Sequence, residues 1–303
     1  RPDIRFGMEL RDASDIASRC DFRVFQDALE AGGRVKGIRV REGADALSRR
    51  VLDDLAAVVK PYGAKGMAWV KVTGKGWQSS LSKFFPEEQK RALNQKMDAR
   101  PGDLILLVAD APRVVHASLG ALRLNVAERL QRIPTDRFQF VWVTRFPLLE
   151  YDEAEERWVA MHHPFTAPLD EDLDRLTDRP ETVRAKAYDL VLNGQEIGGG
   201  SVRNHHLTTQ WKVFEALGIS RESAEAKFGF FLEALKYGAP PHGGMALGFD
   251  RLVAIMGGRR SIREVIAFPK TTSATCPLTD APSKPDAAQL EELGIRIAGG
   301  TED

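Results

Sequence analysis

Residues 243–251 read GGMALGFDR, and this stretch does more than any other to decide the fold class. Glycine-rich backbone is followed at once by an acid–base pair, Asp250 and Arg251, and then by apolar residues at helical spacing up to Gly257. The pattern predicts a strand, a close backbone approach and the start of a helix. An arginine in a first helical turn is unfavourable unless an anion binds there, because that end of the macrodipole is positive. A phosphate site and a plain junction with a solvated arginine are equal alternatives on this stretch alone.

The composition is that of a globular protein with balanced charge. The chain has 303 residues, 43% of them hydrophobic, and its 43 basic residues match its 43 acidic ones. This balance argues against a general nucleic-acid-binding coat, although it is compatible with a local basic surface. Cys20 and Cys276 form neither a disulfide framework nor a metal-ligand spacing, which favours a reducing, cytoplasmic setting. No apolar run has transmembrane length, so we expect no membrane partner.

Changes in local pattern divide the chain into parts. In the leading part, Phe6, Met8 and Leu10 alternate as in a strand, and at 140–143 four apolar residues predict a buried strand. The tail is rich in proline, glycine and acids and has one short predicted helix around 287–293. The predicted parts are a lead, a compact α+β unit, a larger region with unusual polar clusters, and the tail: residues 1–20, 21–116, 117–280 and 281–303.

The clearest local geometry is a predicted hairpin around residues 193–194, which read Asn-Gly and favour a type I′ turn. A two-residue loop sets Asp189 opposite Gly198 and makes Glu196 a diagonal neighbour of Asp189 on one face, about 7–8 Å away. Two carboxylates on one face suit Mg²⁺ bound together with substrate phosphates. A solvated polar face is the alternative. The other face is expected to be core and carries Tyr188, Leu190, Leu192 and Ile197.

Three successive glycines, Gly198–Gly200, follow in the second strand of this hairpin. Glycine weakens a strand unless backbone or a ligand must approach closely, so the run favours a functional reading of the acid-bearing face. Regular pleating would put Arg203 on the face opposite Glu196, because an odd number of residues separates them. An inserted residue corrects this, and we predict a β-bulge within the three glycines. The bulge would bring Arg203 beside the two acids, where it could grip a carboxylate bidentately.

Several stretches together share a pattern with one known family. Residues 243–251 look like motif 3 of the class II aminoacyl-tRNA synthetases, and residues 188–203 look like the strand pair before that motif. Three further stretches fit the same pattern: MHHPFT at 161–166, KFGFFLEAL at 227–235 and YGAPPH at 237–242. Over nearly its whole length the chain resembles the bacterial-type aspartyl-tRNA synthetases. The α+β unit at 21–116 then resembles the GAD domain that these enzymes carry as an insertion.

The resemblance implies a fold and an activity. The fold is an α+β class II synthetase sheet, antiparallel and flanked by helices, with the inserted GAD domain. The activity is that of a cytoplasmic, homodimeric aspartate–tRNA ligase, which uses ATP and Mg²⁺. It joins L-aspartate to ATP as aspartyl-adenylate and passes the aspartyl group to tRNA(Asp). Whether tRNA(Asn) is also charged stays open.

The resemblance also implies roles for individual residues. Arg251 would contact the γ-phosphate of ATP, and Glu196 and Asp189 would hold Mg²⁺ against the phosphates. The segment Gly248, Phe249 and Asp250 would line the nucleotide beside them. Arg203 would bind the aspartate side-chain carboxylate. His162 would help to close the amino-acid pocket with His163 beside it; a satisfied core pair is the alternative for these two histidines.

Other readings remain beside this one. Motifs 1 and 2 and the anticodon-binding domain are expected before residue 1, so the chain could be a non-aminoacylating fragment or paralogue that binds aspartate, nucleotide or tRNA. Another class II enzyme, such as an asparaginyl or lysyl synthetase, is disfavoured by the GAD-like insertion and Arg203. A tRNA-dependent amidotransferase subunit, which also has a GAD-like domain, is disfavoured by motif 3 and the hairpin.

The expected lack of motif 2 gives a first prediction. Residues 1–303 alone should not form aspartyl-adenylate at a useful rate, because the arginine for the α-phosphate and the aromatic for adenine would be missing. Aspartate-dependent ATP–pyrophosphate exchange measures this directly. Exchange clearly above background would contradict the prediction.

Overall fold

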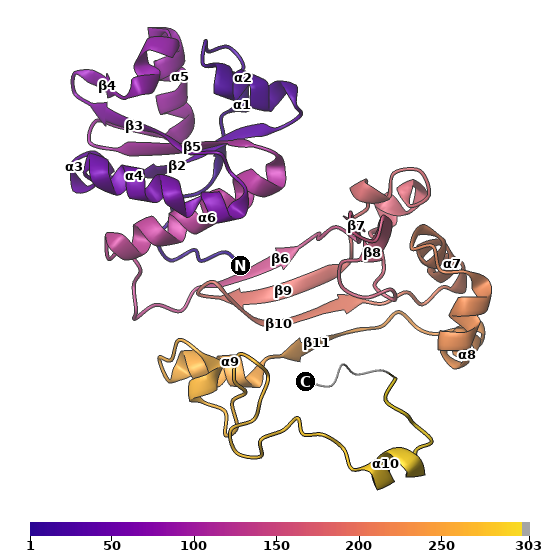
Figure 1. The fold of residues 1–303 in the computed structure, drawn as a ribbon. Coiled ribbons are helices and arrows are strands. Elements are labelled where there is room, and N and C mark those ends of the chain that lie inside the picture. Colours follow the sequence, from indigo (N-terminus) through magenta and orange to yellow (C-terminus); the bar gives the residue numbers. More distant parts are fainter. Residues whose placement is uncertain (299–303) are drawn as a thin grey trace. The chain divides into compact units, whose positions relative to one another are not determined.

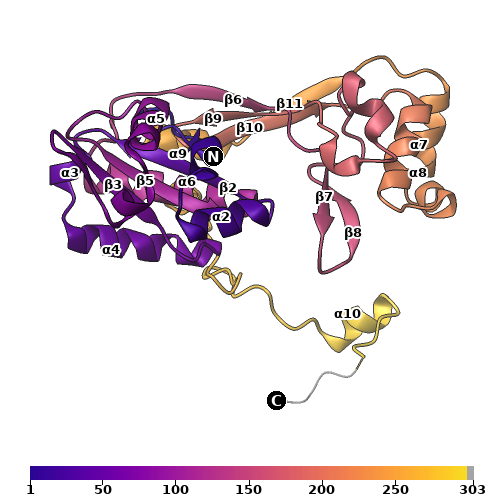
Figure 2. The ribbon, with the colours of Figure 1, turned by 90° about the horizontal axis from the view of Figure 1, so that it is seen from above.

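The computed structural model describes residues 1–298 and separates into two compact units (Figures 1 and 2). One unit comprises residues 3–139. The other comprises residues 1–2 together with the chain from Phe140 onward. The last residues of the predicted tail, 299–303, lie outside the described part of the chain. No helix of residues 1–298 is both long enough and apolar enough to cross a membrane.

The unit of residues 3–139 is built on a five-stranded antiparallel sheet in the order β1-β2-β5-β3-β4. Helices cover both of its faces, α2 and α5 on one and α4 and α6 on the other (Figure 1). The strands are β1 (Arg11–Asp12), β2 (Arg34–Val40), β3 (Ala68–Thr73), β4 (Gly76–Gln78) and β5 (Leu104–Asp110). The helices are α1 (Ser14–Ala17), α2 (Arg23–Glu30), α3 (Gly43–Ala46), α4 (Arg49–Val58), α5 (Glu87–Met97) and α6 (Pro112–Arg129), with 3-10 turns at Lys60–Tyr62 and Ser80–Phe84.

The central strand β5 explains why both faces are covered. Its continuous apolar run is buried throughout residues 104–108, as is typical of an inner strand that is covered on both faces. Alternate side chains enter opposite cores: Ile105 packs in the core that contains Phe25, and Leu106 packs in the core that contains Leu52. The helix carrying Leu52 begins directly after Ser48, whose hydroxyl accepts a hydrogen bond from the first-turn amide of Val51.

This compact unit is wider at both ends than the predicted range 21–116. Before residue 21, β1 pairs with β2. At the other end, residue 116 falls inside α6, whose buried face continues through Leu119 and Leu122 onto the same sheet. The helix crosses the predicted boundary without a break, because its buried face repeats at Val115, Leu119 and Leu122.

The other unit is built on a four-stranded antiparallel sheet in the order β11-β10-β9-β6, with a separate two-stranded hairpin, β7-β8. Its strands are β6 (Phe140–Thr144), β7 (Leu149–Asp152), β8 (Arg157–Ala160), β9 (Ala187–Leu192), β10 (Gln195–Val202) and β11 (Gly243–Leu247). Its helices are α7 (Leu207–Ala216), α8 (Arg221–Lys236), α9 (Phe249–Met256) and α10 (Ala287–Glu292), with 3-10 turns at Asp170–Arg175, Pro180–Thr182 and Ile262–Glu264. The strand-to-helix reading of residues 243–251 is confirmed by β11 and α9, and the short tail helix by α10.

The predicted hairpin is present, but its bulge is not where the sequence placed it. Asn193 and Gly194 have φ of +50° and +81°, as a type I′ turn requires. The register of β9 and β10 shifts between Glu196 and Gly198, so Ile197 is the extra residue. The ladder then runs unbroken through all three glycines, and the prediction of a bulge within Gly198–Gly200 is wrong. As a consequence Asp189 lies opposite Gly199, not Gly198.

The predicted core face of this hairpin also needs correction. Leu192 and Ile197 are buried as expected, but Tyr188 and Leu190 are only half-buried. The more deeply buried face of β9 is the one that carries Asp189. An acid therefore lies on a buried face, which a simple reading of apolar alternation excludes.

Two other predicted strands differ from the structure. The alternation of Phe6, Met8 and Leu10 forms no strand, and β1 begins only at Arg11. The strand at 140–143 is present as β6 but is not buried, since Phe140 and Trp142 are 56% and 54% exposed. Apolar content alone does not show whether another layer covers a strand.

The glycines of β10 are needed because neighbouring strands approach closely. A Cβ on Gly200 would overlap the carbonyl oxygen of Gly244 on β11. A Cβ on Gly198 would lie 2.8 Å from the carbonyl oxygen of Ala246. The prediction that backbone approaches these glycines closely is therefore confirmed. At Gly198 and Gly200 the approaching backbone is that of β11.

Gly200→Ala should separate β10 from β11, at a cost of about 1–3 kcal/mol for overpacking against backbone. The protection of the β10 and β11 amides from hydrogen exchange measures this separation of the two strands. Gly244→Ala is the matched control on the facing strand, because its Cβ would meet nothing within 4 Å. If the amides were equally protected from exchange in Gly200→Ala and Gly244→Ala, the close approach of β11 would not constrain residue 200.

Candidate functional site

A cavity of about 450 Å³ lies beside the sheet of the second unit, where β9, β10, β11 and the start of α9 meet. It gathers every predicted site residue except Arg203 and His163. The lining residues are His162, Asp189, Glu196, Gly198, Gly199, Ala246, Leu247, Gly248, Phe249, Asp250, Arg251 and Ile262. The structure thus brings together the hairpin acids and the motif at 243–251, which are far apart in sequence.

The two hairpin acids share a cationic partner. The Nη2 of Arg1 lies 2.8 Å from Oδ2 of Asp189 and 2.6 Å from Oε2 of Glu196, and its Nε donates to the same Glu196 oxygen at 3.0 Å. Nothing in the sequence marks Arg1 as a site residue, so the sequence did not predict this contact. Its position shows that a positive group fits between the two carboxylates.

Asp189 is the group that most needs a cation, since it is only 3% exposed. Burial raises the pKa of Asp189, and the charge of Glu196 raises it further, while Arg1 and His162 oppose the shift. Its Oδ2 contacts Arg1 but has no partner with hydrogen-bond geometry. A buried acid beside a second acid is stable in its ionised form only with positive charge nearby.

The donor atoms of Asp189 and Glu196 are of the kind that a hard cation such as Mg²⁺ prefers. They offer two carboxylates, one of them with a buried oxygen that accepts no hydrogen bond. Within residues 1–298 no group of three or more His, Cys, Asp or Glu side chains could hold a metal ion. A cation here would therefore have few protein ligands, as is usual for Mg²⁺ that also binds substrate phosphates.

The middle glycine of β10 makes room for the buried acid. A Cβ on Gly199 would lie 2.6 Å from Oδ1 of Asp189. The triple glycine thus has two different partners: β11 at its first and last positions, and a carboxylate at its middle position. The sequence showed that something approaches these residues but not which groups do.

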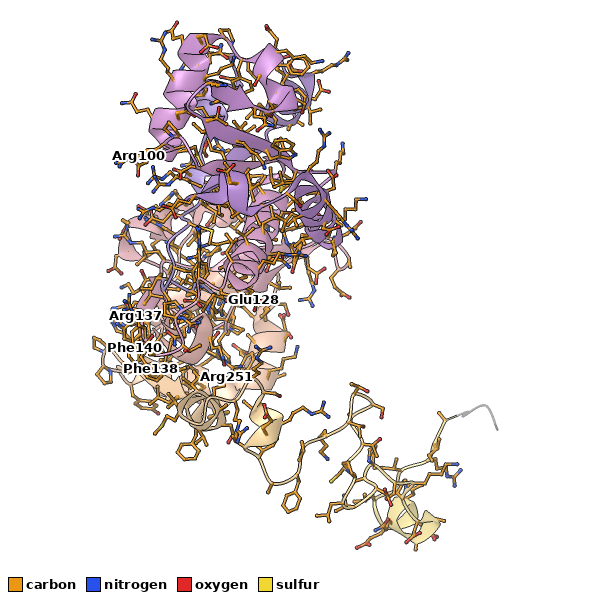
Figure 3. All side chains as sticks on the ribbon, turned by 90° about the vertical axis from the view of Figure 1, so that its left-hand side faces the viewer. Arg100, Glu128, Arg137, Phe138, Phe140 and Arg251 are labelled. Atoms are coloured by element: carbon orange, nitrogen blue, oxygen red, sulfur yellow. The ribbon has the colours of Figure 1, made fainter. Side chains whose placement is uncertain are left out.

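Arg251 joins the start of α9 to the bulge in β10. Its Nη1 donates a 2.7 Å hydrogen bond to the carbonyl oxygen of Glu196 and lies 3.9 Å from Oε1 of the same residue. The side chain is 49% exposed. Figure 3 labels Arg251 among the side chains of the chain. Gly248 provides no side-chain cap, so the first-turn amides of α9 and the Arg251 guanidinium together form a positive edge of the cavity.

Arg203 and His163 lie together, outside the lining of this cavity. Among the described residues Arg203 forms no ion pair with Asp189 or Glu196, so the expected placement of Arg203 against the two acids is not found. Burial lowers the pKa of His163, and the positive charge of Arg203 lowers it further. His163 Nδ1 accepts the amide hydrogen of Phe165 at 3.3 Å, which leaves the proton on Nε2. A neutral donor therefore accompanies the arginine.

The two adjacent histidines have different surroundings. His162 lines the acid cavity and packs edge-on against Phe146, with ring centroids 4.8 Å apart. His163 lies against Phe165, with ring centroids 5.3 Å apart. The two histidines therefore do not form the buried core pair that was the alternative prediction.

The arrangement can be compared with known proteins. Residues 1–272 match the family of tRNA synthetases described as class II (D, K and N). The chain belongs to this family. The predicted class II resemblance and the α+β fold class are confirmed by this match and by the antiparallel sheets with their helices.

Curated relatives specify the resemblance further. An aspartate–tRNA(Asp/Asn) ligase of Geotalea uraniireducens is 54% identical over 97% of this chain and 50% of its own length. An aspartate–tRNA ligase of Staphylococcus carnosus is 51% identical over 98% of this chain and 50% of its own length. The chain thus spans about half the length of the curated relatives it matches. The predicted similarity to bacterial aspartyl-tRNA synthetases is confirmed over nearly the whole chain.

Solved structures add little to this comparison. An aspartyl-tRNA synthetase from Entamoeba histolytica is 15% identical, covers 80% of this chain and 44% of its own, and has a TM-score of 0.34. The family assignment rests on the sequence matches.

The proximity of Arg203 and His163 gives a testable shift. Arg203→Gln should raise the pKa of His163 towards its ordinary value of about 6.5, because it removes the repelling charge, while burial still holds it below that value. Titration of the His163 ring by NMR measures the change. Lys236→Gln is a control, because Lys236 does not contribute to the shift of His163. An unchanged His163 titration in Arg203→Gln would refute the proximity.

Proposed function

We propose that this chain forms the motif 3 portion of an aspartate–tRNA ligase. The observation that carries the proposal is the single cavity in which the acids of the β9–β10 hairpin meet Arg251 and the N-terminus of α9. Family membership and the names of the relatives support the same reaction class. L-Aspartate, ATP and tRNA(Asp) would be the substrates, and tRNA(Asn) a further one if the protein follows the first relative.

The nucleotide would lie along the start of α9. Arg251 and the uncapped amides of the first turn would attract its phosphates, since both are positive and a phosphate accepts several hydrogen bonds. Gly248, Phe249 and Asp250 would line the nucleotide beside them. Preorganised positive groups of this kind act mainly by positioning and by stabilising charge as it develops.

Asp189 and Glu196 would hold Mg²⁺, which would neutralise phosphate charge when bound. Arg1 now takes the position between these carboxylates, so a metal ion and the Arg1 guanidinium would compete for it. Gly199 preserves the space that Asp189 needs in either state.

Arg203 and His163 would receive the aspartate side chain, and His162 would close the pocket. A guanidinium recognises a carboxylate through two charge-assisted hydrogen bonds, which the amide of asparagine cannot match. The lowered pKa of His163 keeps its ring neutral, so that Nε2–H donates without a second positive charge beside Arg203.

The reaction would then proceed in two steps. The aspartate α-carboxylate attacks the α-phosphate of ATP, and pyrophosphate leaves. A terminal ribose hydroxyl of tRNA next attacks the aspartyl carbonyl, and AMP leaves. We further propose that the compact unit of residues 3–139 is the GAD insertion of such an enzyme, and that the whole enzyme is a cytoplasmic homodimer.

The proposal is tested by aspartate-dependent ATP–pyrophosphate exchange in the whole protein that contains this chain. Arg251→Ala should lower the exchange rate about 100-fold, the usual scale for loss of one preorganised donor at a reacting charge. Arg260→Ala, an exposed arginine beyond the end of α9, is the control and should leave the rate unchanged. Exchange that does not depend on aspartate, or that survives Arg251→Ala, would count against the proposal.

A further inference from the structure

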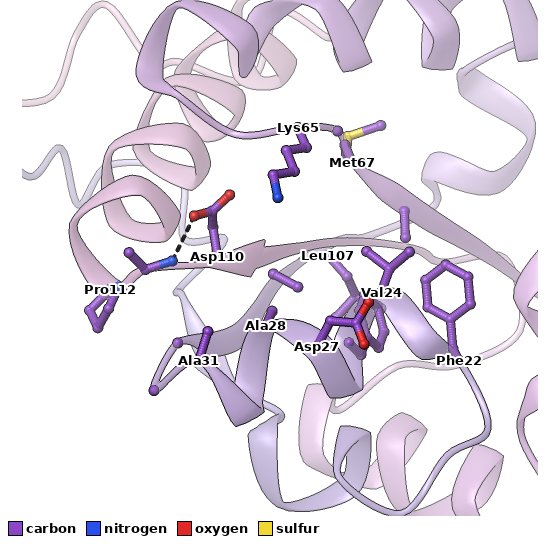
Figure 4. A pocket seen from close by; sticks show the side chains of 17 residues that line it. Phe22, Val24, Asp27, Ala28, Ala31, Lys65, Met67, Leu107, Asp110 and Pro112 are labelled. Carbon is purple, nitrogen blue, oxygen red and sulfur yellow. Dashed lines mark hydrogen bonds between the residues drawn. The ribbon is translucent and has the colours of Figure 1, made fainter.

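A second cavity, of about 650 Å³, lies wholly within the unit of residues 3–139 (Figure 4). It belongs to no part of the proposed ligase site. Figure 4 shows α2 along one side, with Val24 and Ala28, and the segment of Lys65 and Met67 on the opposite side, with the end of β5 between them. The cavity therefore opens where the sheet loses a strand.

The sheet loses this strand because β3 starts late. The pairing of β3 with β5 begins at Ala68, opposite Leu107, while β5 continues to Asp110 and is still paired with β2 on its other side. Residues 65–67 line the cavity and do not pair with β5. The last residues of β5 consequently have one open edge.

The direction of the backbone at this edge follows from the hydrogen bonds of Val35. Its amide donates to the Ser14 hydroxyl at 3.0 Å, and its carbonyl oxygen accepts the Ala13 amide at 2.8 Å, so both groups point away from β5. Ala109, the residue opposite Val35, must then point its own amide and carbonyl away from β2 and into the gap beyond Ala68. In the described part of the chain neither group of Ala109 has a hydrogen-bond partner.

The side walls of the gap suit an apolar side chain. Any residue that paired with Ala109 would place its side chain on the same face as that of Ala109, which packs in the core containing Phe25. On this face Val24 of α2 is 54% exposed, and Ala28 also lines the cavity. One backbone donor, one backbone acceptor and an apolar wall therefore converge on the same space.

The charges at the cavity disfavour a polyanion. Asp27 on α2 and Asp110 at the end of β5 both line it, against one lysine, Lys65. One side-chain oxygen of Asp110 accepts the Ala111 amide hydrogen at 2.8 Å. A neutral or basic ligand meets less repulsion here than a nucleic acid does.

We propose that this cavity binds an extended segment of another polypeptide, neutral or basic, which adds to the sheet beside Ala109. The bound residue donates to the carbonyl of Ala109 and accepts from its amide, and its apolar side chain packs against Val24 and Phe25. Strand addition of this kind gains affinity from main-chain hydrogen bonds and specificity from the side-chain pocket.

Methyl-labelled full chain and synthetic peptides test the proposal by NMR. The probe is acetyl-Thr-Lys-Val-Lys-Thr-amide, with a central valine flanked by basic residues. It should cause saturable shifts at the methyl groups of Val24, Ala28, Met67 and Ala109. The same peptide with an N-methylated central valine should bind at least about tenfold more weakly. The methyl group removes the amide hydrogen that the valine would donate to the carbonyl oxygen of Ala109.

Two protein variants separate the cavity from the rest of the surface. Val24→Asp puts a charge on a half-exposed position of the cavity wall and should abolish the shifts while the melting temperature stays near that of the parent chain. Glu30→Gln, on the same helix but outside the cavity, should leave binding unchanged.

Three results would overturn the proposal. The first is the absence of saturable shifts up to about 2 mM peptide, beyond the range of weak specific binding. The second is equal binding of the N-methylated peptide, which would exclude strand pairing. The third is the same set of shifts caused by a single-stranded RNA of twelve nucleotides and not by the peptide. None of these results depends on the ligase activity.

Discussion

The burial of Asp189 next to Glu196 is the constraint on which the rest of the candidate site depends. Two carboxylates on one side of a sheet repel each other, and burial strengthens the repulsion. The chain meets this with Arg1, whose guanidinium contacts both acids. Within the described chain, Arg1 thus supplies the positive charge that the two neighbouring acids need.

The glycines of β10 make this arrangement possible. Because these glycines have no side chains, β11 can approach β10 closely at Gly198 and Gly200. The side chain of Asp189 fills the space over Gly199. The bulge at Ile197 shifts the pairing of β10 with β9 between Glu196 and Gly198. The backbone carbonyl of Glu196, next to the bulge, accepts a hydrogen bond from Arg251. Strand spacing, acid position and the start of α9 are therefore set by one short segment.

Much of this was open to prediction from sequence, because local chemistry decides it. The Asn-Gly turn and the strand–helix step at 243–251 both follow from rules that act within a few residues. The close approach at the glycines was also predictable, since glycine in a strand needs a reason. Recognition of the family added roles that no spacing alone could give.

The remaining features depend on contacts that local rules do not reach. The position of the bulge depends on how β10 pairs with both of its neighbours, and an apolar Ile197 gave no hint of it. The exposure of Phe140 and Trp142 depends on what covers a strand, and the extent of the unit 3–139 depends on the packing of α6. Arg1 lies 195 residues from Glu196, so only the fold could show their contact.

That separation has a consequence for the order of synthesis. The partners of Arg1 leave the ribosome only after the whole of residues 3–139, and the strand pairs of that unit are all internal to it. The unit of residues 3–139 can therefore fold first. Its two ends lie close together, since Arg5 donates a hydrogen bond to the carbonyl oxygen of Pro134, and this shortens the loop that Arg1 must close. Residues that have no place in the acid cavity would then help it to form, because they lower the entropy cost of closing that loop.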